Sequence, residues 1–201
     1  MAVRDLIYRA LREIGAIGAA EVPTDADADD ALEAFNAMQR EMFGVVVGPR
    51  LIPAPATTSR SVENGERCIT GASPVTLTLG ASPRPGNRFG VVSGVGAVTI
   101  NPNGQRINGA LTATVVTSGS WFYRDDTANW EQERDLVLND DSIFAPELDE
   151  ALVYMLAVRL APSFGEAVTL TPTISALAAQ GTQVFAMRYG RRGRNVMRQA
   201  A

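Results

Sequence analysis

The stretch DLIYRALREIGAIGAAEVPTDADADDALEAFNAM, residues 5–38, predicts two consecutive helices joined by a short link. Gly15 ends the first helix, since glycine readily adopts the conformation that follows a last helical turn. Thr24 stands three residues before Asp27, an acidic variant of the capping box that begins a helix. We expect Gly44 to end this second helix. Apolar residues spaced three and four apart give the first helix one buried face, at Val3, Leu6, Ile7, Ala10, Leu11 and Ile14.

The spacing of apolar residues changes between residues 49 and 137. Apolar and polar residues alternate there instead of following helical spacing, as in VTLTL at 75–79. Short strands between close turns favour a small antiparallel sandwich or barrel that ends in a hairpin. Trp121, Tyr123 and Trp130 lie near the turn of that hairpin. They are either core residues or an exposed aromatic binding surface. Turn signals recur at 82–87, 101–104, 108–109 and 125–129.

Helical spacing returns at residues 138–187, where Pro146 and Pro172 suit the first turns of two further helices. Neither helix pair is expected to be stable alone, so the two pairs should pack together. The sequence therefore predicts an α+β protein with three parts. These are a four-helix bundle from residues 1–48 and 138–187, an inserted antiparallel β domain at 49–137, and an extended C-terminal arm at 188–201.

Composition excludes several kinds of chemistry. The chain has 22 acidic and 18 basic residues, no histidine and one cysteine, Cys68, and every basic residue is arginine. Histidine triads, histidine–zinc sites, P-loop lysines and internal disulfides are therefore absent.

DADADD at 25–30 departs from a calcium loop at Asp30 and Asn36, and we interpret it as an acidic helix start. We expect no catalytic residues, cofactor or metal, and no membrane span, because apolar runs such as Leu152–Val158 are far shorter than the ~18 residues that a span needs.

The C-terminal RYGRRGRNVMRQAA, residues 188–201, is purely basic although the whole chain has a formal charge of −4. Three interpretations fit: a solvated tail, a nucleic-acid arm, or an arm that docks on a protein partner. Apolar side chains interleaved with the charge favour docking on a structured surface. The candidate arm residues are Arg188, Tyr189, Arg191, Arg192, Arg194, Val196, Met197 and Arg198.

Residues 5–38 resemble the opening of the phage head-to-tail adaptor, or head-completion, family, which short-tailed phages share with gene transfer agents. RAL and IG in the first helix, E-x-P-T at 21–24 and DALEAFNAM at 30–38 carry this resemblance. ELDEALVYMLAVRLAPSFG, residues 147–165, is similar to the family's third helix. The chain departs from the family where Phe43 replaces a common tryptophan, and its β insertion is longer than a simple hairpin.

The resemblance implies a structural, non-enzymatic virion protein of the neck, present in the host cytoplasm during assembly. Adaptors of this family form a dodecameric ring of neighbouring copies beneath the portal protein, extend the DNA channel and offer a platform to the next tail component, whether stopper, nozzle or tail tube. Their C-terminal segment grips the portal. We expect the isolated chain to be a monomer or weak oligomer, with the portal as template. The resemblance also implies that the β module faces the tail, with Trp121, Tyr123 and Trp130 as its tail-facing aromatics. The alternatives are a nucleic-acid-binding accessory protein that uses the arginine tail, and a β module with carbohydrate-related activity.

Overall fold

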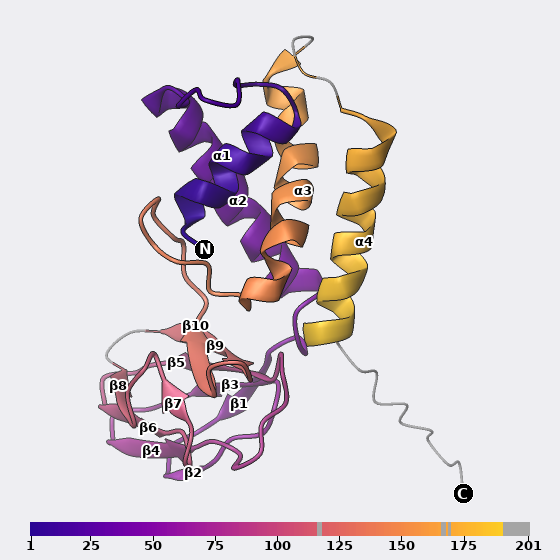
Figure 1. The fold of residues 1–201 in the computed structure, drawn as a ribbon. Helices are drawn as coiled ribbons and strands as arrows, with labels where there is room; N and C mark the ends of the chain where they lie inside the picture. The colour runs from indigo at the N-terminus through magenta and orange to yellow at the C-terminus, as the bar shows by residue number, and fades with distance from the viewer. Residues whose placement is uncertain (116–117, 166–167, 169, 191–201) are drawn as a thin grey trace, which may run out of the picture.

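The computed structural model describes residues 1–115, 118–165, 168 and 170–190. Over these residues the chain is an α+β protein with four α-helices and two mixed sheets (Figure 1). The helices are α1 (Val3–Glu13), α2 (Asp25–Val45), α3 (Asp149–Leu160) and α4 (Pro172–Tyr189), with 3-10 turns η1 (Pro146–Leu148) and η2 (Ala161–Ser163) on either side of α3. The strands are β1 (Ile52–Pro55), β2 (Arg60–Ser61), β3 (Glu66–Ile69), β4 (Val75–Thr78), β5 (Arg88–Val92), β6 (Val98–Asn101), β7 (Arg106–Ile107), β8 (Ala113–Val115), β9 (Gly119–Arg124) and β10 (Asn129–Gln132).

Local capping signals set most of the helix boundaries. The Thr24 hydroxyl accepts a hydrogen bond from the Asp27 amide at 3.2 Å and donates one to the Asp27 carboxylate at 2.6 Å. The predicted N-cap of α2 is therefore confirmed. Gly15 follows the end of α1 with a φ of 73°. The expected stop at Gly44 is wrong, because α2 continues to Val45. An exposed glycine inside a helix costs only about 1 kcal/mol, which the packing of the last turn offsets.

The helices that precede and follow the strands in sequence pack against one another. α3 lies against α1, α2 and α4, and α1 also contacts α2. α4 presents one face to this core, and Gly181 on that face allows close approach to Ala151 of α3. The buried residues of this face are Ile174, Ala178, Gly181, Phe185 and Tyr189.

The strands form a six-stranded sheet, in the order β1-β3-β5-β9-β10-β7, and a four-stranded sheet, in the order β2-β4-β6-β8. The predicted antiparallel arrangement is wrong, because five of the eight strand pairs are parallel. From β1 to β6 the chain alternates between the two sheets, so each connection crosses the core instead of forming a hairpin. Cys68 pairs with Val91 and Leu77 with Ile100, and the partner's number is higher by 23 in both sheets. The chain therefore winds like a coil, and each turn contributes one strand to each of the two sheets.

The predicted terminal hairpin is confirmed, since β9 and β10 pair antiparallel with Tyr123 opposite Trp130. Alternation along β9 sends successive side chains to opposite faces. Trp121 and Tyr123 enter the core between the two sheets, whereas Phe122 enters the helical core. The strands therefore do not form a domain independent of the helices, because β9 contributes side chains to both cores.

Candidate functional site at the helix–sheet junction

An aromatic cluster joins the sheet to the helices. The Phe122 ring lies 5.0 Å from Phe43 at the end of α2, 5.6 Å from Phe144 and 5.8 Å from Tyr189 at the end of α4, measured between ring centroids. Phe185 of α4 makes an edge contact with Phe144 at 5.1 Å. Each such pair adds about 0.5–1.5 kcal/mol beyond the burial of apolar area. The cluster therefore fixes the larger sheet against α2 and α4.

A buried ion pair lies beside this cluster. The Arg88 guanidinium of β5 binds both Glu133 carboxylate oxygens, at 2.6 and 2.7 Å. Its third nitrogen donates to the Phe43 carbonyl at 2.5 Å and to the Val47 carbonyl at 3.3 Å. The Phe43 carbonyl belongs to the last turn of α2 and Val47 follows the helix, so the guanidinium lies at the C-terminal end of α2, where a cation is favourable. Arg88 thus connects the sheet, the segment after β10 and the end of α2.

Three distant backbone segments meet at glycines in the same junction. The Gly48 amide donates to the Tyr189 carbonyl at 2.7 Å, and Val47 forms a β-bridge with Gly190. Gly48 and Gly86 have φ of 60° and 78°, a region that favours glycine. A side chain at Gly86 would meet the Tyr189 backbone. The close approach therefore depends on glycine at 86.

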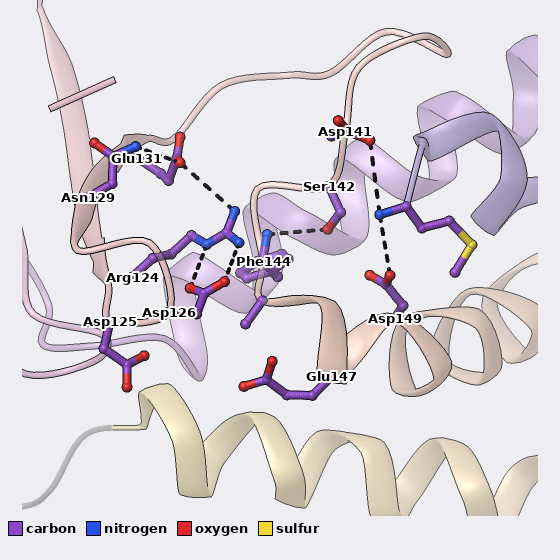
Figure 2. A network of polar contacts seen from close by, with 12 residues as sticks. Arg124, Asp125, Asp126, Asn129, Glu131, Asp141, Ser142, Phe144, Glu147 and Asp149 are labelled. Carbon is purple, nitrogen blue, oxygen red and sulfur yellow. Dashed lines mark hydrogen bonds and ion pairs between the residues drawn. The ribbon is translucent and has the colours of Figure 1, made fainter. Parts of the chain in front are cut away.

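The turn of the β9–β10 hairpin carries a second arginine network. Figure 2 shows Arg124 between Asp126, at 2.6 and 3.0 Å, and Glu131, at 3.9 Å. Asn129 donates to the Glu131 carboxylate at 2.8 Å, which holds this acid toward the arginine. The hydrogen bond from Arg124 lowers the pKa of Asp126 below its ordinary value. The hairpin turn is therefore ordered by paired charges that are mostly buried.

Replacing Asp126 with asparagine should lower the free energy of unfolding by about 1 kcal/mol at neutral pH. A carboxylate whose folded pKa is lowered contributes stability above the unfolded pKa, and this contribution is lost as pH falls through the folded pKa. The difference between wild type and variant should therefore be constant near neutrality and disappear in acid. Urea denaturation at several pH values measures it. A difference that persists unchanged at the lowest pH would contradict this assignment.

The root of the predicted arm is part of the folded protein. Tyr189 is fully buried, and its hydroxyl accepts the Ala145 amide at 3.2 Å, so it cannot fill a partner's pocket as predicted. Arg188 pairs with Asp125 of the hairpin turn at 2.7 Å and with Glu147 of η1 at 3.0 Å. The arm therefore begins after Gly190, the C-cap of α4. The other predicted arm residues lie outside the described residues: Arg191, Arg192, Arg194, Val196, Met197 and Arg198.

The predicted tail-facing surface of Trp121, Tyr123 and Trp130 is wrong in this structure. The three side chains are 3, 6 and 4% exposed and pack in the core between the sheets. Trp121 stacks on Phe89 with ring centroids 5.1 Å apart. Of the two interpretations of these aromatics, core packing therefore holds.

An open cleft of about 440 Å³ lies beside the end of α2, and residues just before β1 and residues of β3, β5 and β9 also line it. Three of its residues are arginines, Arg50, Arg67 and Arg88, and one is an acid, Glu133. Sequence reasoning missed this cleft, because Arg50 and Arg67 stand singly in the chain and become neighbours through the parallel pairing of β1 with β3. Its other lining residues are Phe43, Gly44, Leu51 and Ser120.

In the part of the chain that the structure describes, three or more acidic or cysteine side chains nowhere gather in a way that could hold a metal ion. None of the described helices is long and apolar enough to cross a membrane.

The chain matches no protein-family model, and no curated protein matches it either.

Proposed function

We propose that the protein is a structural virion component, a head-to-tail adaptor that forms a ring beneath the portal. One observation carries the proposal. The two segments that resemble adaptors, residues 5–38 and 147–165, lie more than 100 positions apart and fold against each other, since α3 contacts both α1 and α2. In the proposal the helices are the four-helix bundle that forms the ring wall, and residues 49–137 are the inserted β domain.

Charge supports the same role. A ring that lines a DNA channel must let a polyanion pass without binding it, and a chain with a formal charge of −4 repels phosphates. Several of the described arginines are already paired with acids, as Arg88 is with Glu133 and Arg124 with Asp126. The basic residues of the C-terminal tail are then the proposed contact to the portal protein.

The position of the tail root constrains this contact. α4 ends beside the sheets, so the 11 residues after Gly190 start from the sheet side of the helices (Figure 1). Fully extended, they would span up to about 36 Å, more than the roughly 27 Å length of α4. In the proposal this segment extends along the helices to a portal at their far end, and the sheets face the next tail component.

The tail arginines provide the test. Replacing Arg191, Arg192 and Arg194 with alanine should weaken portal binding at least about tenfold, because arginine pairs bidentately with carboxylates. The fold should be unchanged, since none of the three belongs to the described core. Portal affinity and duplex-DNA affinity are measured on the same variant at two salt concentrations.

The outcomes separate the candidate functions. Unchanged portal affinity would refute the proposal that the C-terminal arm binds the portal. Loss of strong, salt-sensitive DNA binding with intact portal binding would favour the nucleic-acid accessory protein instead. Arg188→Ala is the matched control, because Arg188 is held by Asp125 and Glu147 within the fold. It should affect the fold's stability more than portal affinity.

A further inference from the structure

The cleft at the helix–sheet junction carries positive charge that the fold does not use. Arg88 is fully engaged by Glu133 and by the carbonyls at the end of α2. Arg50 and Arg67 are exposed, and neither makes an ion pair or side-chain hydrogen bond with any residue that the structure describes. Two free guanidinium groups beside a concave surface suit carboxylates. The cleft is therefore a candidate site for an acidic segment.

The strand beside the cleft cannot take up a partner strand. β1 is the edge of the larger sheet, and its sequence is IPAP. The Ile52 and Ala56 amides donate to the Gly65 and Ile69 carbonyls, on the side of β3. The main-chain nitrogens of the odd-numbered residues between them therefore face the free edge of the sheet. Those positions are Pro53 and Pro55, which have no amide hydrogen to donate. A partner at this edge must therefore bind through side chains, and the exposed Ile52, 67% accessible, adds an apolar contact.

The opposite end of the same helix carries the complementary charge. α2 begins with DADADD, residues 25–30. Asp25, Asp29 and Asp30 are exposed and form no ion pair with the described part of the chain, whereas Asp27 is bound by Thr24. The neighbouring Val22 is 72% exposed. Both ends of α2 therefore combine free charge of one sign with an exposed aliphatic side chain.

These two surfaces cannot meet within one molecule. A helix of 21 residues is roughly 30 Å long, which separates the acidic start of α2 from the cleft at its end. A contact between them requires a second copy of the chain. Such a contact joins two different surfaces, so it repeats from copy to copy and closes into a ring when the rotation permits.

We propose that the Arg50 and Arg67 cleft of one copy receives the acidic start of α2, residues 25–30, of the next. The inference rests on the proposed adaptor ring and names the contact between its neighbouring copies. Charge complementarity steers the encounter, and Val22 and Ile52 contribute apolar contact. In the free chain the contact is weak, because exposed ion pairs contribute little individually.

Charge reversal on each side tests the contact. One variant carries Arg50→Glu with Arg67→Glu, and the other carries Asp25→Arg with Asp29→Arg. Each alone places like charges in contact and should weaken the concentration-dependent self-association of the full chain at least about tenfold. Mixed in equal amounts, each variant offers the other an opposite charge, so association should return. Sedimentation velocity over a concentration series measures both effects, and circular dichroism checks the fold of each variant.

The control variant is Arg4→Glu with Arg84→Glu, at two exposed arginines outside the cleft, which changes the net charge by the same amount as Arg50→Glu with Arg67→Glu. It should associate like the wild type. Absence of any association by the wild-type chain, association of either reversed variant at wild-type strength, or a mixture that fails to recover would each overturn the proposal. Duplex DNA bound by the wild type and lost with Arg50→Glu and Arg67→Glu would overturn it too, because the cleft would then hold phosphates.

Portal binding is measured on the same variants, so the two proposals fail separately. Full rings on the portal from both reversed variants would refute this contact and leave the adaptor role intact. A wild-type chain that self-associates as described but does not bind the portal would refute the adaptor role and leave the contact.

Discussion

Replacing Arg88 with alanine is expected to lower the free energy of unfolding by about 3–5 kcal/mol, because it leaves the Glu133 carboxylate largely buried without its partner. The pair is bidentate, at 2.6 and 2.7 Å, and its side chains are only 8 and 13% exposed. The same change removes the donor to the Phe43 carbonyl at the end of α2. Urea denaturation, followed by helical circular dichroism, measures the loss.

Arg40→Ala is the matched control. Arg40 pairs with Asp135 at 2.6 Å, but both side chains are more than half exposed, so the expected cost is below about 1 kcal/mol. Removing both partners, as in Arg88→Ala with Glu133→Ala, should cost less than the sum of the two single changes. Equal losses for Arg88→Ala and Arg40→Ala would show that the junction does not depend on the buried pair.

The helices were predictable because their signals are local. Thr24 and Asp27 cap α2 within one turn, Pro172 begins α4, and Gly15 follows α1. The stop at Gly44 failed because a single glycine is a weak signal, and the packing of Met42 and Phe43 against the core outweighs its cost.

The sheet topology was not predictable from the same sequence. Alternation by two tells which side chains share a face, but it does not say which strand lies alongside. The turn signals at 82–87, 101–104 and 108–109 do not mark hairpins, because each lies where the chain passes from one sheet to the other. Only at β9 and β10, where four residues separate the strands, did proximity along the chain decide the pairing.

The candidate site depends on the same long-range information. Arg88 and Glu133 stand 45 positions apart, and the pairing of β1 with β3 creates the cleft of Arg50 and Arg67. The burial of Tyr189 was missed because the arginines after it suggested an exposed tail. A spacing signal was present, since Tyr189 continues the buried face of α4 four residues after Phe185.

Replacing Gly86 with alanine is expected to destabilise the protein by about 3 kcal/mol or more, from two effects that act together. A positive φ costs a residue with a Cβ about 1–2 kcal/mol, and the added methyl meets the Tyr189 backbone. Since the Tyr189 carbonyl also accepts the Gly48 amide, moving it apart weakens the contact between α4 and the segment after α2.

Gly104→Ala separates the two effects. Gly104 has a φ of 89°, close to the 78° of Gly86, but no atom lies within 4 Å of its would-be Cβ. It should therefore cost only the conformational strain, about 1–2 kcal/mol.

Tryptophan fluorescence reports the core between the sheets through Trp121 and Trp130, and circular dichroism reports the helices. Because Phe122 and Gly86 tie both parts to one junction, the two signals should shift together in Gly86→Ala. A loss equal to that of Gly104→Ala would show that the contact with the Tyr189 backbone adds nothing to the cost. A shift of one signal alone would mean that the helices and sheets do not unfold as one unit.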